Sequence, residues 1–178
     1  AAAWFLWLEQ EFVYVGDEAV VEPSGKSRRL GLDLGLRWQF LKNFYFQADY
    51  TYCHARSIGE PNGQDYIPLA PVHTLVAGLN YQNKGFNANL RCRYMSDRPA
   101  NEDYSITADG YFIADFNASY RYRMVTIGTF IENLFNAKWK EAQFATETRL
   151  QNEPVSVTEL HYTPGTPFNA RAYITIHF

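Results

Sequence analysis

The sequence has few cysteines and no long apolar run, and both shortages narrow the class of protein. Its 178 residues include two cysteines, Cys53 and Cys92, whose separation matches no metal-binding spacing. No apolar stretch approaches the roughly 20 residues that a membrane-spanning helix needs. The longest, residues 1–8, lacks the basic leader and the cleavage site of a signal peptide. Because no start signal is present, we expect the chain to be a fragment of a longer protein.

The chain has no large excess of either sign of charge, whereas aromatic residues are abundant. The formal charge is −3, and both signs are spread along the sequence without a basic stripe. We therefore expect no nucleic-acid partner. Thirteen Tyr, thirteen Phe and four Trp make 17% of the chain aromatic, a load that is typical of β-barrels and of membrane interface belts.

Apolar and polar residues alternate with a period of two over most of the chain. In residues 29–41 the even positions carry Leu, Trp or Phe up to Phe40, and the odd positions up to Gln39 carry Arg, Gly, Asp or Gln. Successive side chains of a β-strand point to opposite faces, so this segment has one apolar and one polar face. Helical spacing is confined to residues 138–148, inside a long loop.

The same alternation predicts eight strands of about the length that a tilted membrane strand needs. In the first, Trp4, Leu6, Leu8, Phe12 and Tyr14 form the predicted apolar row, which Phe5 and Trp7 interrupt. Cys53 and Cys92 fall on opposite predicted faces, so we expect no disulfide between them. The predicted strands are residues 4–14, 29–41, 44–52, 73–82, 86–94, 112–122, 125–132 and 170–178.

Short and long connections alternate strictly between these strands. The short ones are residues 41–43, 82–85 and 123–124. The long ones are residues 16–27, 56–71, 96–110 and 136–169. Bacterial outer-membrane barrels place short turns in the periplasm and long loops outside the cell. This pattern predicts an all-β fold of antiparallel transmembrane β-barrel strands.

Alternation alone also fits a soluble lipocalin-like barrel, which has its apolar face inside. Two features favour a membrane barrel, in which the apolar face is outside and contacts lipid. The mapped apolar rows carry no charged residue, and a charge at the bilayer midplane costs roughly 2–4 kcal/mol. Aromatic residues on these rows gather at the strand ends, as interface girdles do: Trp38, Phe40, Tyr50, Tyr52, Tyr81, Tyr94, Tyr120 and Tyr122.

Several segments resemble the TonB-dependent receptors of the bacterial outer membrane. TFIENLFNAKWKEA (residues 129–142) resembles their penultimate strand and following loop, with Asn133-Leu134-Phe135 as its most specific part. PGTPFNARAYITIHF (residues 164–178) is similar to their ending and to the signal read by barrel-assembly machinery. RRLGLDLGLRW and IPLAPVHTLVAGLNY resemble earlier strands. Phe168 and Trp139 depart from the family, which often has a basic residue and a Tyr at those positions.

The resemblance implies a 22-stranded barrel with an N-terminal plug folded inside. Residues 1–178 would be a single barrel segment, the C-terminal eight strands, with the plug and the TonB-engaging segment absent. Such receptors import scarce nutrients such as iron-siderophore complexes, haem, vitamin B12 or glycans. The expected partners are outer-membrane lipid, the plug, the remaining strands, TonB and a nutrient. The alternatives are a stand-alone eight-stranded outer-membrane barrel with a structural or adhesive role, and a soluble ligand-binding barrel.

The sequence offers no catalytic motif, metal cluster or cofactor site. Histidines fall near the predicted outer ends with serine and aspartate in nearby loops, but no nucleophile motif surrounds them: His54, His73, His161, Ser57, Asp65 and Asp97. We therefore do not expect an enzyme. Charged residues on the polar face predict an interior ion-pair lattice or a surface for the plug.

The last long loop, residues 136–169, is the predicted ligand contact. Long loops that carry aromatic and charged residues are often functional. The residues that we expect to contact a ligand are Trp139, Arg149, His161 and Tyr162.

Overall fold

The computed structural model describes residues 1–15, 20–23 and 25–178, and their regular elements are all β-strands. No helix in this part of the chain has the length and apolarity needed to cross a bilayer. The strands are β1 (Ala2–Leu8), β2 (Phe12–Val15), β3 (Val20–Pro23), β4 (Ser27–Leu41), β5 (Phe44–Ser57), β6 (His73–Asn83), β7 (Phe86–Met95), β8 (Arg98–Pro99), β9 (Thr107–Ala108), β10 (Tyr111–Tyr122), β11 (Val125–Glu132), β12 (Lys140–Thr148), β13 (Val157–Pro164) and β14 (Asn169–Ile176).

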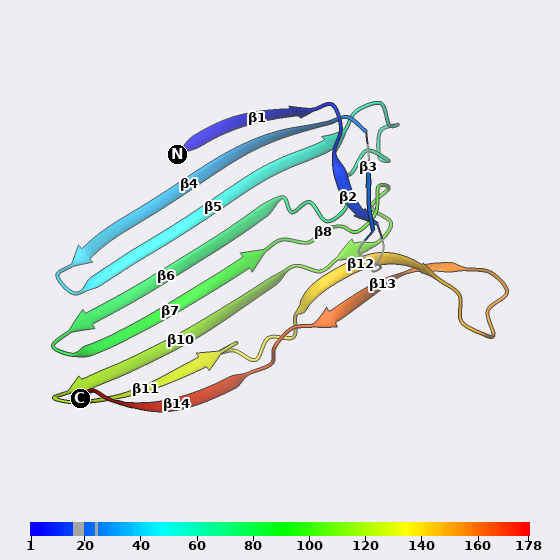
Figure 1. The fold of residues 1–178 in the computed structure, drawn as a ribbon. Coiled ribbons are helices and arrows are strands. Elements are labelled where there is room, and N and C mark those ends of the chain that lie inside the picture. Colours follow the sequence, from blue (N-terminus) through cyan, green and yellow to red (C-terminus); the bar gives the residue numbers. More distant parts are fainter. Residues whose placement is uncertain (16–19, 24) are drawn as a thin grey trace.

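Eight of these strands form one antiparallel sheet in the order β1-β4-β5-β6-β7-β10-β11-β14. Each strand pairs with the next one of the sheet along the chain, which confirms the predicted series of eight antiparallel strands. Figure 1 shows the sheet as one curved layer, with β1 and β14 at its two edges. The layer is therefore an open piece of barrel wall.

The three short turns lie together at one end of the sheet, as predicted (Figure 1). Between β6 and β7, Lys84 and Gly85 adopt φ values of 42° and 86°. Positive φ at both central residues is the type I′ geometry, which matches the twist of the flanking strands. Lys42 and Asn43 join β4 to β5, and Arg123 and Met124 join β10 to β11.

The long connections lie at the other end and carry small hairpins of their own, which the sequence did not indicate. β2 pairs with β3, β8 with β9, and β12 with β13. Two predictions are wrong here. The first predicted strand ends at Leu8, because residues 12–15 belong to the separate β2–β3 hairpin. Within residues 138–148, which have helical spacing, the structure has strand β12 (Lys140–Thr148) instead of a helix. Residues 16–19 of the first predicted loop lie outside the described residues.

The register corrects the predicted apolar row of the first strand. Trp4 lies opposite Gly31, and Phe5 lies opposite Leu30. Directly opposed residues share a face, so Phe5 and Trp7 belong to the outward apolar face and Trp4 to the inner one. The reason is local: the Trp4 ring covers Gly31, where a Cβ would clash with it, and its Nε1 donates to Asp33 Oδ2 at 2.9 Å.

The outward rows form an exposed apolar surface between two aromatic bands. Leu34 and Leu36 lie in its middle and are exposed, as lipid-facing side chains are. At the loop end, the rings of Tyr52 and His73 are tilted with their centroids 5.3 Å apart, and the rings of Phe112 and Phe135 are stacked with their centroids 6.5 Å apart. At the turn end, successive ring centroids lie 4.6–5.9 Å apart across Trp38, Phe40, Phe44, Tyr81 and Phe86.

The inner face carries ion pairs between neighbouring strands, which confirms the predicted polar lattice. Arg37 Nη2 and Asp49 Oδ2 are 2.8 Å apart, and Arg93 Nη2 and Asp115 Oδ2 are 3.3 Å apart. Because these partners come from adjacent strands, the pairs also hold the register of the sheet. Both cysteines are free, as predicted.

Candidate ligand-binding surface

Two of the long connections at one end of the sheet are joined to each other by backbone hydrogen bonds. Leu69 N donates to Pro99 O at 2.7 Å, and Tyr66 N donates to Glu102 O at 3.1 Å. These bonds join the connection after β5 to the loop that carries β8. The loops therefore hold defined positions at this end of the sheet.

The β2–β3 hairpin is anchored on the inner side of the same end. Val13 packs with Ala55 and Ile67 in a small buried cluster. Glu11, which precedes β2, is buried and forms an ion pair with Arg29 of β4. An apolar contact and an ion pair thus tie this hairpin to the wall.

Asn133 draws together the two stems of the last loop. It is 2% exposed and has φ of 49°, a conformation that Asn tolerates better than most residues. Its Nδ2 donates to Ala137 O at 2.8 Å and to Thr166 O at 3.0 Å, and its Oδ1 accepts from Ala137 N at 2.8 Å. This is a physical reason for the asparagine of the Asn-Leu-Phe sequence.

Gln143 clamps the β12–β13 hairpin onto the wall. Its side chain is 1% exposed. The Oε1 atom accepts from Asp109 N and Nε2 donates to Asp109 O, both at 2.8 Å. Lys140 adds an ion pair from Nζ to Asp109 Oδ2 at 2.6 Å. Arg98 Nη1 also donates to Asp109 O, at 3.4 Å, and burial lowers the pKa of the Arg98 guanidinium.

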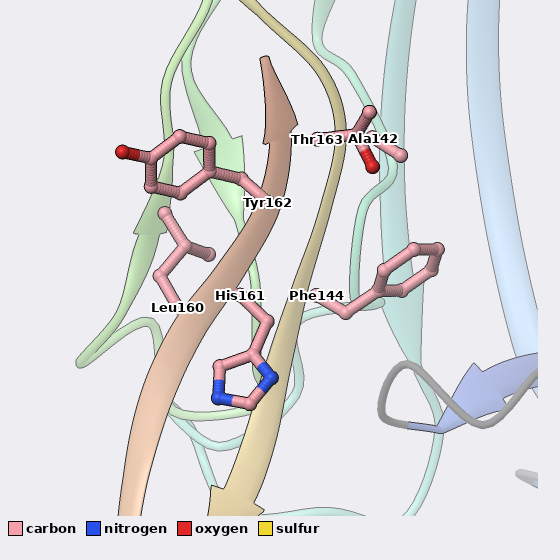
Figure 2. Close-up of a pocket in the computed structure, with 6 residues that line it drawn as sticks. All are labelled: Ala142, Phe144, Leu160, His161, Tyr162 and Thr163. Atoms are coloured by element: carbon pink, nitrogen blue, oxygen red, sulfur yellow. The ribbon is translucent and has the colours of Figure 1, made fainter.

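From this clamp the hairpin extends away from the sheet (Figure 1) and carries a shallow hollow of about 440 Å³. Figure 2 shows Tyr162 on one side of β13 and His161 directed differently, as neighbours on a strand are. Phe144 lies opposite His161 on β12. Lys140 Nζ lies 4.5 Å from the Tyr162 ring centroid. The lining residues are Ala142, Phe144, Leu160, His161, Tyr162 and Thr163.

Two of the four predicted contact residues, His161 and Tyr162, line this hollow, and the other two lie elsewhere. Trp139 packs at the base of the loop, where its ring covers Gly165 and its Nε1 donates to Thr166 O at 3.1 Å. Arg149 lies near the hairpin tip, where its Nε donates to Glu153 O at 3.1 Å.

Leu160 and Thr163 also line the hollow, and the prediction missed them. Their signal was the alternation of residues 157–164, which indicates a strand.

The histidines and serines at this end are not assembled for catalysis. His54 lies opposite Leu30 on the outward face, whereas Ser57 lies opposite Ser27 on the inner face. Within residues 1–15, 20–23 and 25–178, no group of three His, Cys, Asp or Glu side chains could hold a metal ion.

Comparison with known proteins gives the family. The family model described as "TonB dependent receptor-like, beta-barrel" matches residues 1–134. Comparison with curated protein sequences finds no match.

Solved structures share the fold at low sequence identity. The ferric-catecholate import receptor Fiu of E. coli K12 has a TM-score of 0.69 at 20% identity, over 98% of this chain and 24% of that one. The siderophore receptor PiuA of Acinetobacter baumannii has a TM-score of 0.69 at 14% identity, over 97% of this chain and 25% of that one. The copper transporter OprC has a TM-score of 0.66 at 18% identity, over 99% and 28%.

The chain thus spans about a quarter of the length of the first two structures. The family match and the fold agree with the outward apolar face and the aromatic bands, and they favour neither an enzyme nor a stand-alone barrel. The chain belongs to the TonB-dependent receptor β-barrel family, proteins of the Gram-negative outer membrane.

Proposed function

We propose that this chain forms part of the wall of a receptor that imports scarce nutrients such as iron-siderophore complexes. We further propose that the β12–β13 hairpin contacts the ligand outside the cell. The observation that carries the second proposal is the hollow beside His161, Tyr162 and Phe144, clamped in place by Gln143. Trp139 and Arg149 would support the base and the tip of the same hairpin.

The side chains of the hollow favour an organic complex over a bare metal ion. Phe144 and Tyr162, on opposite faces of the hairpin, each present a ring that suits a flat apolar group. Lys140 lies beside the Tyr162 ring but is paired with Asp109. Among the described residues no metal-binding cluster exists, so iron would arrive inside its chelator. Fiu is a ferric-catecholate import receptor, PiuA is a siderophore receptor and OprC is a copper transporter, so similar folds serve different cargo.

The inner face supports a role as the wall around a plug. Its exposed Arg37–Asp49 pair offers charged partners to a polar domain packed inside. We propose that residues 1–178 are a single barrel segment, and that the complete receptor adds further strands, a plug and a segment that engages TonB. Edges β1 and β14 support this proposal, because unpaired backbone groups are not tolerated in lipid.

The test is energy-dependent uptake by the complete receptor in cells that lack the gene for it. We expect cells with the receptor to accumulate radiolabelled iron from one of a panel of siderophores, and we expect a proton uncoupler to abolish the accumulation. Tyr162→Ala should weaken binding of the siderophore to the purified receptor, whereas Thr158→Ala, an exposed change on the same strand, should leave binding unchanged. Equal uptake with and without the receptor across the panel would refute import of this cargo.

A further inference from the structure

Charged side chains on the outward face of the eight-stranded sheet occur at one place within the described residues. The register puts Arg28 opposite Arg56 and Trp7 opposite Arg28, in one row across β1, β4 and β5. The remaining outward positions of these eight strands carry no Asp, Glu, Lys or Arg. Two arginines side by side on a lipid-facing surface are costly unless they meet an anion.

The row lies at the headgroup level of the outer leaflet. It is at the loop end of the sheet, which faces outside in this family. The next outward row toward the bilayer holds Phe5, Leu30 and His54, and the aromatic pair Tyr52 and His73 follows it. The arginines therefore sit just beyond the aromatic band, where lipid phosphates are found.

Arg28 is available for binding, and Arg56 is held in place beside it. Arg28 is exposed and makes no hydrogen bond or ion pair with any described residue. Arg56 Nε lies 3.4 Å from Asp65 Oδ2, and its guanidinium lies 4.1 Å above the Tyr66 ring. This second contact orders the planar group and leaves donors of the guanidinium for another acceptor.

A hollow of about 370 Å³ opens between this row and the connection after β5. Trp7 and Arg28 line it together with Ser57, at the end of β5, and Asn62 of the connection. Glu60 and Asp65 also line it. Asp65 is already paired with Arg56. Glu60 forms no ion pair with a described residue, so it is the lining carboxylate that would oppose a bound anion.

We propose that this hollow binds the phosphate-bearing headgroup of an outer-leaflet lipid. Arginine matches phosphate oxygens with two parallel hydrogen bonds. Trp7, which is half exposed, would lie against the sugar or glycerol part of the headgroup. The acyl chains would cover Phe5 and Leu30 below. The inference rests on the outward orientation of the loop end and is independent of which nutrient is imported.

The test uses the complete receptor, freed of lipid in detergent and titrated with the diphosphorylated glycolipid lipid A, with bound lipid counted by native mass spectrometry. We expect Arg28→Gln to weaken binding about fivefold, since one interfacial arginine contributes about 1 kcal/mol. Adding Arg56→Gln should weaken it further. Arg123→Gln, which removes an arginine at the opposite, turn end of the sheet, should have no effect.

Two further binding measurements test the proposal even if the arginine variants fail to fold. Glu60→Gln should tighten binding, because it removes the opposing carboxylate and leaves both arginines untouched. Lipid A without its phosphates should bind more weakly to the unaltered receptor. Equal binding of the two lipids, no effect of Glu60→Gln, or displacement of the lipid by excess inorganic phosphate would each overturn the assignment of a lipid-headgroup site.

Discussion

Replacing Gln143 with Leu should release the β12–β13 hairpin from the wall without unfolding the sheet. The change removes both 2.8 Å hydrogen bonds between the Gln143 amide and the Asp109 backbone. Each bond contributes about 0.5–1.5 kcal/mol. The Asp109 carbonyl keeps its longer contact with Arg98. The local penalty from the two bonds is therefore about 1–3 kcal/mol.

Hydrogen exchange of the complete receptor measures this penalty directly. A local opening that is easier by about 2 kcal/mol should speed exchange of the Asp109 amide by about thirtyfold, while amides of the central strand β5 keep their rates. Gln151→Leu, near the tip of the same hairpin, is the matched control and should leave the Asp109 rate unchanged. Equal Asp109 rates in the two variants would show that Gln143 is not the clamp.

Two further predictions concern the wall and one outer turn. Gly31→Ala should destabilise the sheet by about 1–3 kcal/mol, because the added Cβ would lie 2.0 Å from the Trp4 ring. Gly35→Ala should be tolerated, because its Cβ would lie 3.4 Å from the nearest neighbouring atom. Equal unfolding midpoints of the two variants in urea would refute this prediction. Hydrogen bonds from Ser105, first from its backbone amide, lower the pKa of Asp103. These bonds stabilise the turn fully at pH values above the ordinary carboxyl pKa. The stabilisation is lost as the pH falls through the lowered pKa of Asp103. The protection of the Ser105 amide, measured as its exchange rate relative to an unprotected amide at the same pH, should therefore fall in acid. The same loss of protection in Asp103→Asn would contradict this role of Asp103.

The period-two pattern was sufficient to predict most of the wall, because lipid on one side and polar groups on the other act on every strand alike. It failed at the first strand. Trp4 is apolar yet faces inward, where it covers Gly31 and bonds to Asp33. Hydrophobicity does not distinguish a lipid-facing ring from one that covers a glycine, and only the register of β1 against β4 separates them.

The loops were less predictable because their structure depends on distant partners. Residues 138–148 carry local helical spacing, but β12 forms since β13 pairs with it and Asp109 holds Gln143. Tyr162 and His161 reach the hollow because that hairpin exists. In the sequence Trp139 is an equally plausible ligand contact, because it is aromatic and lies in the same loop. In the structure it packs at the base of the loop instead.

The central claim is that the even-numbered face of β4 meets lipid and the odd-numbered face meets the barrel interior. The most direct measurement is the folding yield of the complete receptor in lipid vesicles for the neighbouring changes Leu34→Arg and Asp33→Leu. Leu34 is an exposed residue of the outward row, so arginine there should cost about 2–4 kcal/mol near the midplane and block insertion. Asp33→Leu loses hydrogen bonds to Trp4 and Thr51 but places no charge in lipid, so most of the yield should remain. Equal yields, or the reverse order, would contradict the account.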